Sequence, residues 1–184
     1  KRWRDILQDS WKYIQNLNLR EIHFELSYET LESVLERCRP YVQSIAMPYA
    51  VEEEEEYLEN ILAILVEKQP PKLIGLDLND LDLNSWITRA LGNFTNLEKL
   101  KIDSLRRDYS KDDMKELVES LMNLKEFYYK GGEFEFLRYI NWQKMEKLNL
   151  ELNSYKQHFN FLAALPKPAL KSLTLETSYP CYGL

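Results

Sequence analysis

The sequence is poor in the residues that usually build metal sites and catalytic centres. Among 184 residues it has two histidines, His23 and His158, and two cysteines, Cys38 and Cys181. These four residues are far apart, whereas zinc ligands usually come in closely spaced pairs. The sequence also lacks a G-x-S-x-G phrase, an H-E-x-x-H phrase and a phosphate-binding glycine loop. We therefore expect no metal, no cofactor and no enzymatic activity, and we expect free thiols in a reducing compartment.

Positive charge and long apolar runs are scarce as well. The 24 Lys and Arg residues are outnumbered by 30 Asp and Glu residues, which gives a net charge of −6 and an isoelectric point near 5.1. This balance argues against a protein that coats nucleic acid. The longest apolar run, ILAILV at 61–66, is far shorter than the roughly 20 residues of a membrane-spanning helix, and no signal-peptide pattern precedes it. We expect a soluble protein of the cytoplasm or nucleus.

A short apolar pattern recurs along the chain. Seven phrases share the order apolar-x-x-apolar-x-apolar, and their starts are 21 to 31 residues apart. The phrases are, in order, IQNLNL from Ile14, VQSIAM from Val42, LIGLDL from Leu73, LEKLKI from Leu97, LKEFYY from Leu124, MEKLNL from Met145 and LKSLTL from Leu170. Such a period indicates a repeat architecture. The last two apolar positions of each phrase are two residues apart, so they lie on one face of a short strand.

Between the phrases the apolar spacing changes to about 3.6 residues, as an α-helix requires. The expected helices cover 27–38, 52–68, 84–91, 110–122, 133–140 and 154–165. Ser27 and Ser110 stand at the starts of two of them and are typical N-cap residues. This alternation of strands and helices predicts a curved β/α solenoid, in which stacked strands form a parallel sheet and the helices return on the outer face.

The pattern resembles that of the leucine-rich-repeat family over roughly residues 12–178. In that family the strand phrase usually continues to an Asn or Cys, and here the corresponding slot matches only at Asn153. The resemblance implies an α/β leucine-rich-repeat solenoid with a parallel β-sheet on the concave face and helices on the convex face. We expect residues 12–184 to form one domain of about seven irregular repeats. We expect it to be truncated at the C-terminus, because no helix follows the last phrase.

Residues 1–19, KRWRDILQDSWKYIQNLNL, resemble the end of an F-box that runs into a first repeat. The resemblance rests on a basic residue before Trp3, on Arg4 in a closing helix, and on the second tryptophan, Trp11. It implies that residues 1–11 end an F-box and that the chain is part of a longer protein. That protein would be the substrate-recognition subunit of a cullin-based ubiquitin ligase, with a Skp-type adaptor and a cullin as partners, and other subunits would carry out the transfer chemistry.

A second interpretation of residues 1–11 is a plain N-terminal capping helix, since the open end of a solenoid exposes apolar surface. The chain would then be a non-catalytic leucine-rich-repeat scaffold or regulatory binding protein unrelated to ubiquitination. The fold alone does not choose between these two functions, because binding surfaces are grafted onto a common scaffold.

The strand residues between the apolar positions form rows on the concave face that the core does not need. Five of them converge on the fourth to sixth repeats: Lys99, Lys101, Tyr128, Lys130 and Lys147. We predict that they bind an acidic segment of a protein target, with Tyr128 as the anchor and the lysines steering the encounter. The alternative is that the lysines only keep an exposed sheet soluble. Binding of single-stranded RNA is a weaker alternative, because the protein is acidic overall.

Overall fold

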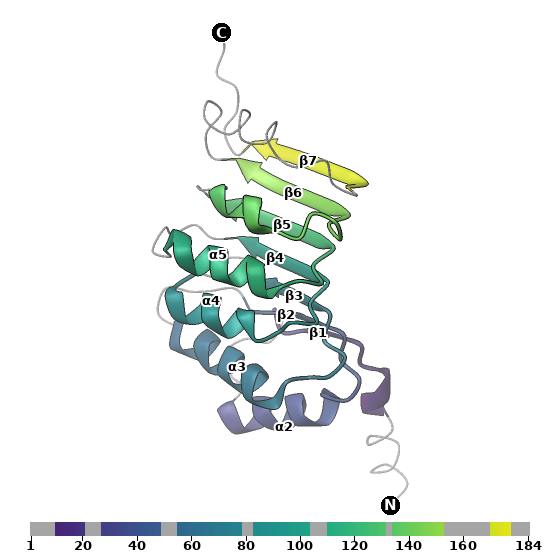
Figure 1. Ribbon diagram of the computed structural model, residues 1–184. Coiled ribbons are helices and arrows are strands. Elements are labelled where there is room, and N and C mark those ends of the chain that lie inside the picture. The colour runs from purple at the N-terminus through teal and green to yellow at the C-terminus, as the bar shows by residue number, and fades with distance from the viewer. Residues whose placement is uncertain are drawn as a thin grey trace, which may run out of the picture.

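The computed structural model describes residues 10–20, 27–48, 55–78, 83–103, 110–131, 134–152 and 170–177. Its centre is one sheet of seven parallel strands that follow one another in chain order (Figure 1). The strands are β1 (Asn16–Asn18), β2 (Ser44–Ala46), β3 (Gly75–Leu78), β4 (Lys99–Asp103), β5 (Glu126–Gly131), β6 (Lys147–Leu152) and β7 (Ser172–Thr177).

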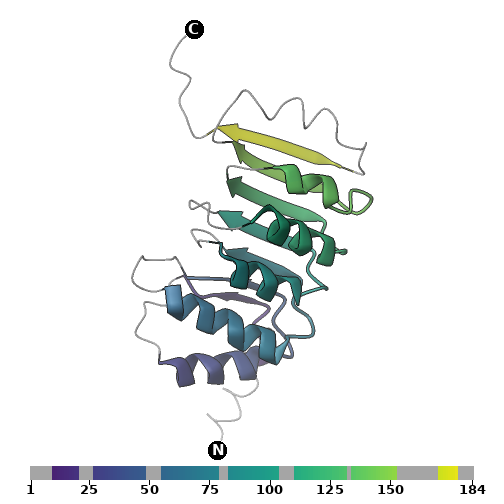
Figure 2. The same ribbon diagram turned by 60° about the vertical axis from the view of Figure 1, so that its left-hand side comes forward.

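Helices cover one face of this sheet. They are the 3₁₀ helix η1 (Trp11–Tyr13), the α-helices α2 (Tyr28–Cys38), α3 (Glu55–Lys68), α4 (Ser85–Gly92) and α5 (Lys111–Ser120), and the 3₁₀ helix η2 (Glu135–Tyr139). From α2 to η2, each helix packs against the next in chain order, and Figures 1 and 2 show them as one layer in front of the strands. The result is a two-layer α/β arrangement. We call the sheet face that points away from this helical layer the open face.

The apolar phrases are aligned in the sheet as the sequence predicts. The middle apolar residue of each phrase pairs in register with the middle apolar residue of the next. This row consists of Leu17, Ile45, Leu76, Leu100, Phe127, Leu148 and Leu173. From Ile45 to Leu148 its members are at most 3% exposed, and they belong to the core between sheet and helices. Burial of one such side chain stabilises the fold by roughly 1.5–3 kcal/mol.

Polar residues begin the helices where the sequence predicts. The Ser27 hydroxyl accepts a hydrogen bond from the Thr30 amide at 3.3 Å, and the Ser110 hydroxyl accepts one from the Asp113 amide at 3.0 Å. Asn84 caps α4 in the same manner. Each cap satisfies an amide that the helix itself leaves unpaired, which is worth about 1 kcal/mol.

One expected helix has a different form. Residues 133–140 are expected to contain a short helix, and the structure has the 3₁₀ helix η2 there rather than an α-helix, with no side-chain cap at Phe134. The phrases on either side begin only 21 residues apart, the shortest step in the chain. A 3₁₀ helix rises about 2.0 Å per residue against 1.5 Å for an α-helix, so it spans the same distance with fewer residues.

Aromatic side chains compensate for this short helix. Phe136 of η2 packs against Phe127 and Tyr129 of β5, with ring centroids 6.3 and 5.0 Å away, and Phe134 packs against Tyr129 at 5.5 Å. Edge-to-face contacts of this kind add to the area that the rings bury. These ring contacts therefore pack the short helix η2 against the sheet.

Several expected features lie outside the described residues. These are the end of the F-box or capping helix up to residue 9, the helix at 154–165, His23, His158, Asn153 and Cys181. Cys38 is described: it is fully buried on α2, where burial raises the pKa of its thiol.

Candidate binding surface on the open face of the sheet

The open face carries polar side chains in rows that cross the strands. The register places one row along the first positions of the strands, a second row two residues further on and a third after that. From β3 to β7 the rows are Gly75, Lys99, Glu126, Lys147 and Ser172; then Asp77, Lys101, Tyr128, Asn149 and Thr174; then, from β4, Asp103, Lys130, Glu151 and Glu176. Because strand residues alternate between faces, none of these side chains is part of the apolar row beneath them.

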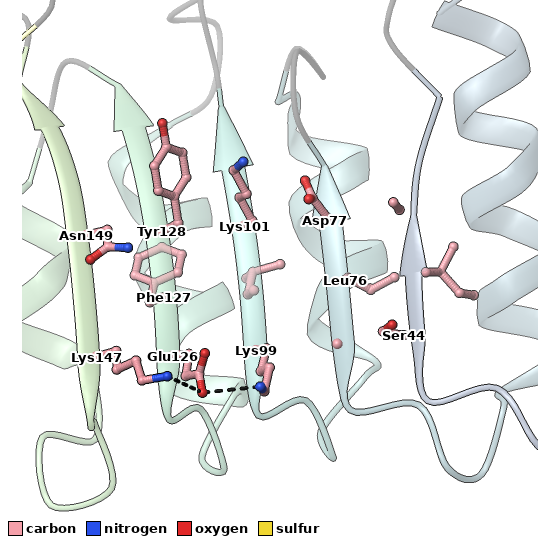
Figure 3. Close-up of a pocket in the computed structure, with 14 residues that line it drawn as sticks. Ser44, Leu76, Asp77, Lys99, Lys101, Glu126, Phe127, Tyr128, Lys147 and Asn149 are labelled. Atoms are coloured by element: carbon pink, nitrogen blue, oxygen red, sulfur yellow. Dashed lines mark hydrogen bonds and ion pairs between the residues drawn. The ribbon is translucent and has the colours of Figure 1, made fainter. Parts of the chain in front are cut away.

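A hollow of about 350 Å³ lies on this face over β2 to β6. Its floor on β2 and β3 is made of the small residues Ser44, Ala46 and Gly75 together with Asp77, and its other side is bordered by longer polar side chains of β4 and β5 (Figure 3). A Cβ at Gly75 would stand 3.1 Å from the Ser44 Cβ, which is closer than side chains normally approach. Any larger residue at position 75 would therefore press against Ser44 on the floor of the hollow.

Two lysines bracket one glutamate at the edge of the hollow. The Nζ atoms of Lys99 and Lys147 each lie 3.2 Å from Oε1 of Glu126, as the dashed lines in Figure 3 show. Partial burial acts to raise the pKa of Glu126, but the hydrogen bonds from Lys147 and Lys99 outweigh it and hold that pKa below its usual range. Both lysine side chains remain about half exposed, at 55% and 53%. They can therefore accept a further anionic partner.

Lys101 has a different environment. Its Nζ lies 4.7 Å from the centroid of the Tyr128 ring, and within the described part of the chain it makes no ion pair. The Tyr128 hydroxyl donates a hydrogen bond to Oε2 of Glu151 at 3.0 Å. Burial first, and then this acceptor, raise the pKa of Tyr128 well above its usual value, so the phenol stays protonated. Lys101 is thus a cation held against a fixed aromatic ring.

Lys130 lies in the third row and serves another purpose. Its Nζ is 3.2 Å from Oδ2 of Asp103 and 3.6 Å from Oε1 of Glu151. Lys130 does not border the hollow, whereas Lys99, Lys101, Tyr128 and Lys147 do. The structure thus brings four of the five predicted residues around one hollow. It places Lys130 beside them, where it holds the carboxylate that orients Tyr128.

No family model matches the sequence, and no curated protein matches it. A solved structure with a similar fold is that of the leucine-rich repeat-containing protein LegL7 from Legionella pneumophila, with a TM-score of 0.52 and 10% sequence identity. The match covers 92% of this chain and 59% of that one, so this chain spans less than two thirds of the length of its neighbour. The chain has the fold of a leucine-rich-repeat protein. At this identity the likeness concerns the fold alone.

On this leucine-rich-repeat fold, basic and acidic side chains alternate along the rows of the open face. The sequence prediction singled out the lysines, but carboxylates of the same rows lie between them, above all Glu126 and Glu151. The strand register reveals these neighbours, since residues at the same position of successive phrases become adjacent in the sheet. An ion pair that the strand pattern does not reveal joins the side chains of Arg20 and Asp77 at 2.5 Å.

The described residues provide neither a metal cluster nor a membrane span. Among them, no three His, Cys, Asp or Glu side chains gather where they could hold a metal ion. No helix in the described part of the chain is long and apolar enough to cross a membrane.

Proposed function

We propose that this chain is a non-catalytic leucine-rich-repeat solenoid that binds a protein target on the concave, open face of its sheet. The observation that carries the proposal is that one face of the strands builds the core while the other carries polar side chains that the core does not use. Leu100 and Leu148 face the helices and are at most 2% exposed, while their neighbours Lys101 and Asn149 face outward. Side chains on the open face are thus available for binding at no cost to the core.

Lys99, Lys101, Tyr128, Lys130 and Lys147 are the proposed partner-binding residues. Their strands are continuous members of one sheet, so their relative positions are set before a target arrives. A preorganised surface loses little side-chain entropy on binding, which favours affinity. The contact between Lys101 and Tyr128 is the proposed anchor, because aromatic residues and cations dominate the binding energy of protein interfaces.

We further propose that the natural protein is the F-box subunit of a cullin-based ubiquitin ligase in the cytoplasm or nucleus. Residues 1–11 would end the F-box, and residues 12–184 would form the substrate-recognition domain. The support is the sequence resemblance of residues 1–19 together with the place of Trp11. In η1, directly before β1, Trp11 packs partly buried against the core, with Arg37 of α2 5.8 Å above its ring. A preceding helix would therefore be anchored to the first repeat.

The same observation favours the alternative scaffold function. Trp11 covers apolar surface at the β1 end of the sheet whether or not an F-box precedes it, as a solenoid cap must. In that case the open face organises a complex without any link to ubiquitin. Recognition of a target on the open face is common to both functions, and only the partners at the other end differ.

Affinity purification of the natural full-length protein from its own cells, followed by mass spectrometry, separates the two functions. A ubiquitin-ligase subunit should recover a Skp-type adaptor and a cullin in stoichiometric amounts, together with target proteins. The same purification with Lys101→Glu and Tyr128→Ala should lose the targets and keep the adaptor and cullin. Targets without adaptor or cullin would contradict the ubiquitin-ligase function. Targets that survive the double substitution would contradict binding on the open face.

A further inference from the structure

The hollow on the open face has an asymmetric shape and charge. Among the outward side chains of β2 and β3 that line it, those of Ser44 and Ala46 are short and Gly75 has none, while Asp77 supplies a carboxylate. On β4 two lysines, Lys99 and Lys101, stand on the same face because they are two residues apart in a strand. The register places Lys99 directly beside Gly75. Free volume above the small residues is therefore bordered on one side by two ammonium groups.

The charges around the hollow do not cancel locally. Lys99 and Lys147 share a single carboxylate oxygen of Glu126, so this trio retains a positive charge. Lys101 adds another, since its described contact is the uncharged ring of Tyr128. Asp77 lies opposite Lys101 in register, but its charge is balanced by the ion pair with Arg20. The hollow thus favours an anion, although the whole protein is acidic.

The third row limits how many negative charges the occupant can carry. Asp103, Glu151 and Glu176 lie on the same face, one row beyond Lys101 and Tyr128. Lys130 of the same row pairs with Asp103 and Glu151, so the row holds three carboxylates and one ammonium group. A continuous polyanion such as a nucleic acid would place charges against this excess of negative charge, which is unfavourable. A single acid within a neutral segment meets the lysines alone. The alternation of basic and acidic rows therefore disfavours ligands that carry several acidic groups in succession.

From this geometry we propose that the hollow binds one Asp or Glu side chain of an extended, otherwise uncharged segment of a protein partner, with its carboxylate between Lys99 and Lys101. The inference rests on the proposed function in that the occupant belongs to a protein target. Charge-assisted hydrogen bonds from the two ammonium groups hold the carboxylate. The small residues on the floor leave room for the backbone that carries it.

The test uses the full chain and a displayed library of random peptides of about 12 residues, enough to cross the hollow at roughly 3.3 Å per residue. Peptides enriched on the chain should share one acidic position with neutral neighbours. Fluorescence anisotropy then measures the best peptide and its counterpart with the acid replaced by the amide. Replacement of the acid should weaken binding by about tenfold or more, in keeping with the loss of a close charge pair.

Three variants locate the site. Ala46→Leu fills the floor of the hollow, and Lys101→Gln removes one cation. Each should lower the affinity for the acidic peptide by about tenfold. With Lys101→Gln, the affinities for the acidic peptide and for its amide counterpart should differ by no more than about threefold. Lys111→Glu is the control, because it changes an exposed lysine of α5 on the helical face; binding should stay within about twofold. Thermal unfolding of each variant establishes that it is folded, and Lys101→Gln decides the test if Ala46→Leu does not fold.

Three results would overturn the inference: no enriched peptide, enriched peptides without an acid, or full binding by folded Lys101→Gln or Ala46→Leu. These failures are distinguishable from failure of the proposed function. If natural targets still co-purify with the Lys101→Gln and Ala46→Leu variants, the chain is an interaction domain, but the hollow does not bind an acidic side chain. Acidic peptides that bind as expected, with no adaptor or cullin recovered from cells, would retain the hollow as a binding site and remove the ubiquitin-ligase function.

Discussion

Lys101 and Tyr128 lie directly opposite each other on β4 and β5, and the lysine Nζ is 4.7 Å from the centre of the tyrosine ring. The tyrosine is in turn held through its hydroxyl by Glu151, and Glu151 also pairs with Lys130. A chain of contacts therefore fixes one aromatic ring and one cation at the centre of the open face. Such a preformed pair is a suitable anchor for a partner.

The combined substitution Lys101→Glu and Tyr128→Ala should abolish binding of the target recovered from cells. It removes the aromatic contact and reverses the charge, so an acidic segment is repelled. Both side chains project from the open face, and we expect the free energy of unfolding to change by no more than about 1–2 kcal/mol. Calorimetric titration with the target and urea unfolding measure the two effects. Unaltered affinity would reject this pair as the anchor.

The apolar row should behave in the opposite manner. Leu100→Ala or Leu148→Ala removes a side chain that is at most 2% exposed, and each should lower the free energy of unfolding by roughly 2–5 kcal/mol. Asn149→Ala, next to Leu148 but on the open face, is the matched control and should cost less than about 0.5 kcal/mol. Urea unfolding gives the values. A wild-type midpoint for both leucine variants would show that the register is wrong.

The loss of unfolding free energy caused by a Leu-to-Ala substitution should depend on the position of the leucine in the sheet. Leu173 of β7 is the register partner of Leu148, yet its side chain is 49% exposed. The same change, Leu173→Ala, removes about half as much buried area and leaves no closed cavity, so we expect a loss of about 1 kcal/mol or less. The comparison needs only the two variants in one urea series. A loss at Leu173 equal to that at Leu148 would contradict the exposure of the last strand.

Acid should weaken the contact between α4 and α5. Hydrogen bonds from Ser85 and then Ser110 hold the pKa of Asp113 below its ordinary value. A carboxyl whose pKa is lowered by folding contributes stability above its unfolded pKa of about 3.9 and loses that contribution as pH falls through the folded pKa. Wild type should therefore exceed Asp113→Asn in unfolding free energy at about pH 7, with a gap that narrows towards about pH 3. A constant gap across this range would exclude the carboxylate as its source.

Arg20 should support binding without touching the target. Its ion pair balances Asp77, which lies opposite Lys101 in register. With Arg20→Ala, the freed carboxylate of Asp77 competes for Lys101, and we expect the affinity for the acidic peptide to fall by about threefold to tenfold. The double variant that carries both Arg20→Ala and Asp77→Asn should regain the affinity for the acidic peptide. If Arg20→Ala acted by unfolding the protein, the second substitution would not restore binding. Weak binding by both the single and the double variant would show that Arg20 has only a structural role.

Local pattern was sufficient to predict the strands and most helices. Alternating residues place one face of a strand in the core, so the apolar spacing alone aligns the phrases around Leu76, Leu100 and Leu148. Cap residues act within four residues of their own position, and Ser27 and Ser110 therefore cap helices where expected. A short helix at 133–140 was predicted as well, but not its 3₁₀ form, since that form depends on the distance to be spanned rather than on its own apolar spacing.

The sequence by itself determined the order and register of the strands, the inward leucines and the set of side chains available on the open face, because these follow from periodicities of two and 3.6 residues. Only the tertiary structure decided how the outward side chains combine: Lys99 and Lys147 on one oxygen of Glu126, Lys130 with Glu151, and Arg20 with Asp77. The physical reason is distance. Charges from segments more than 20 residues apart interact only when the strands are brought side by side, and the free volume above Gly75 exists only between neighbours that the chain supplies separately.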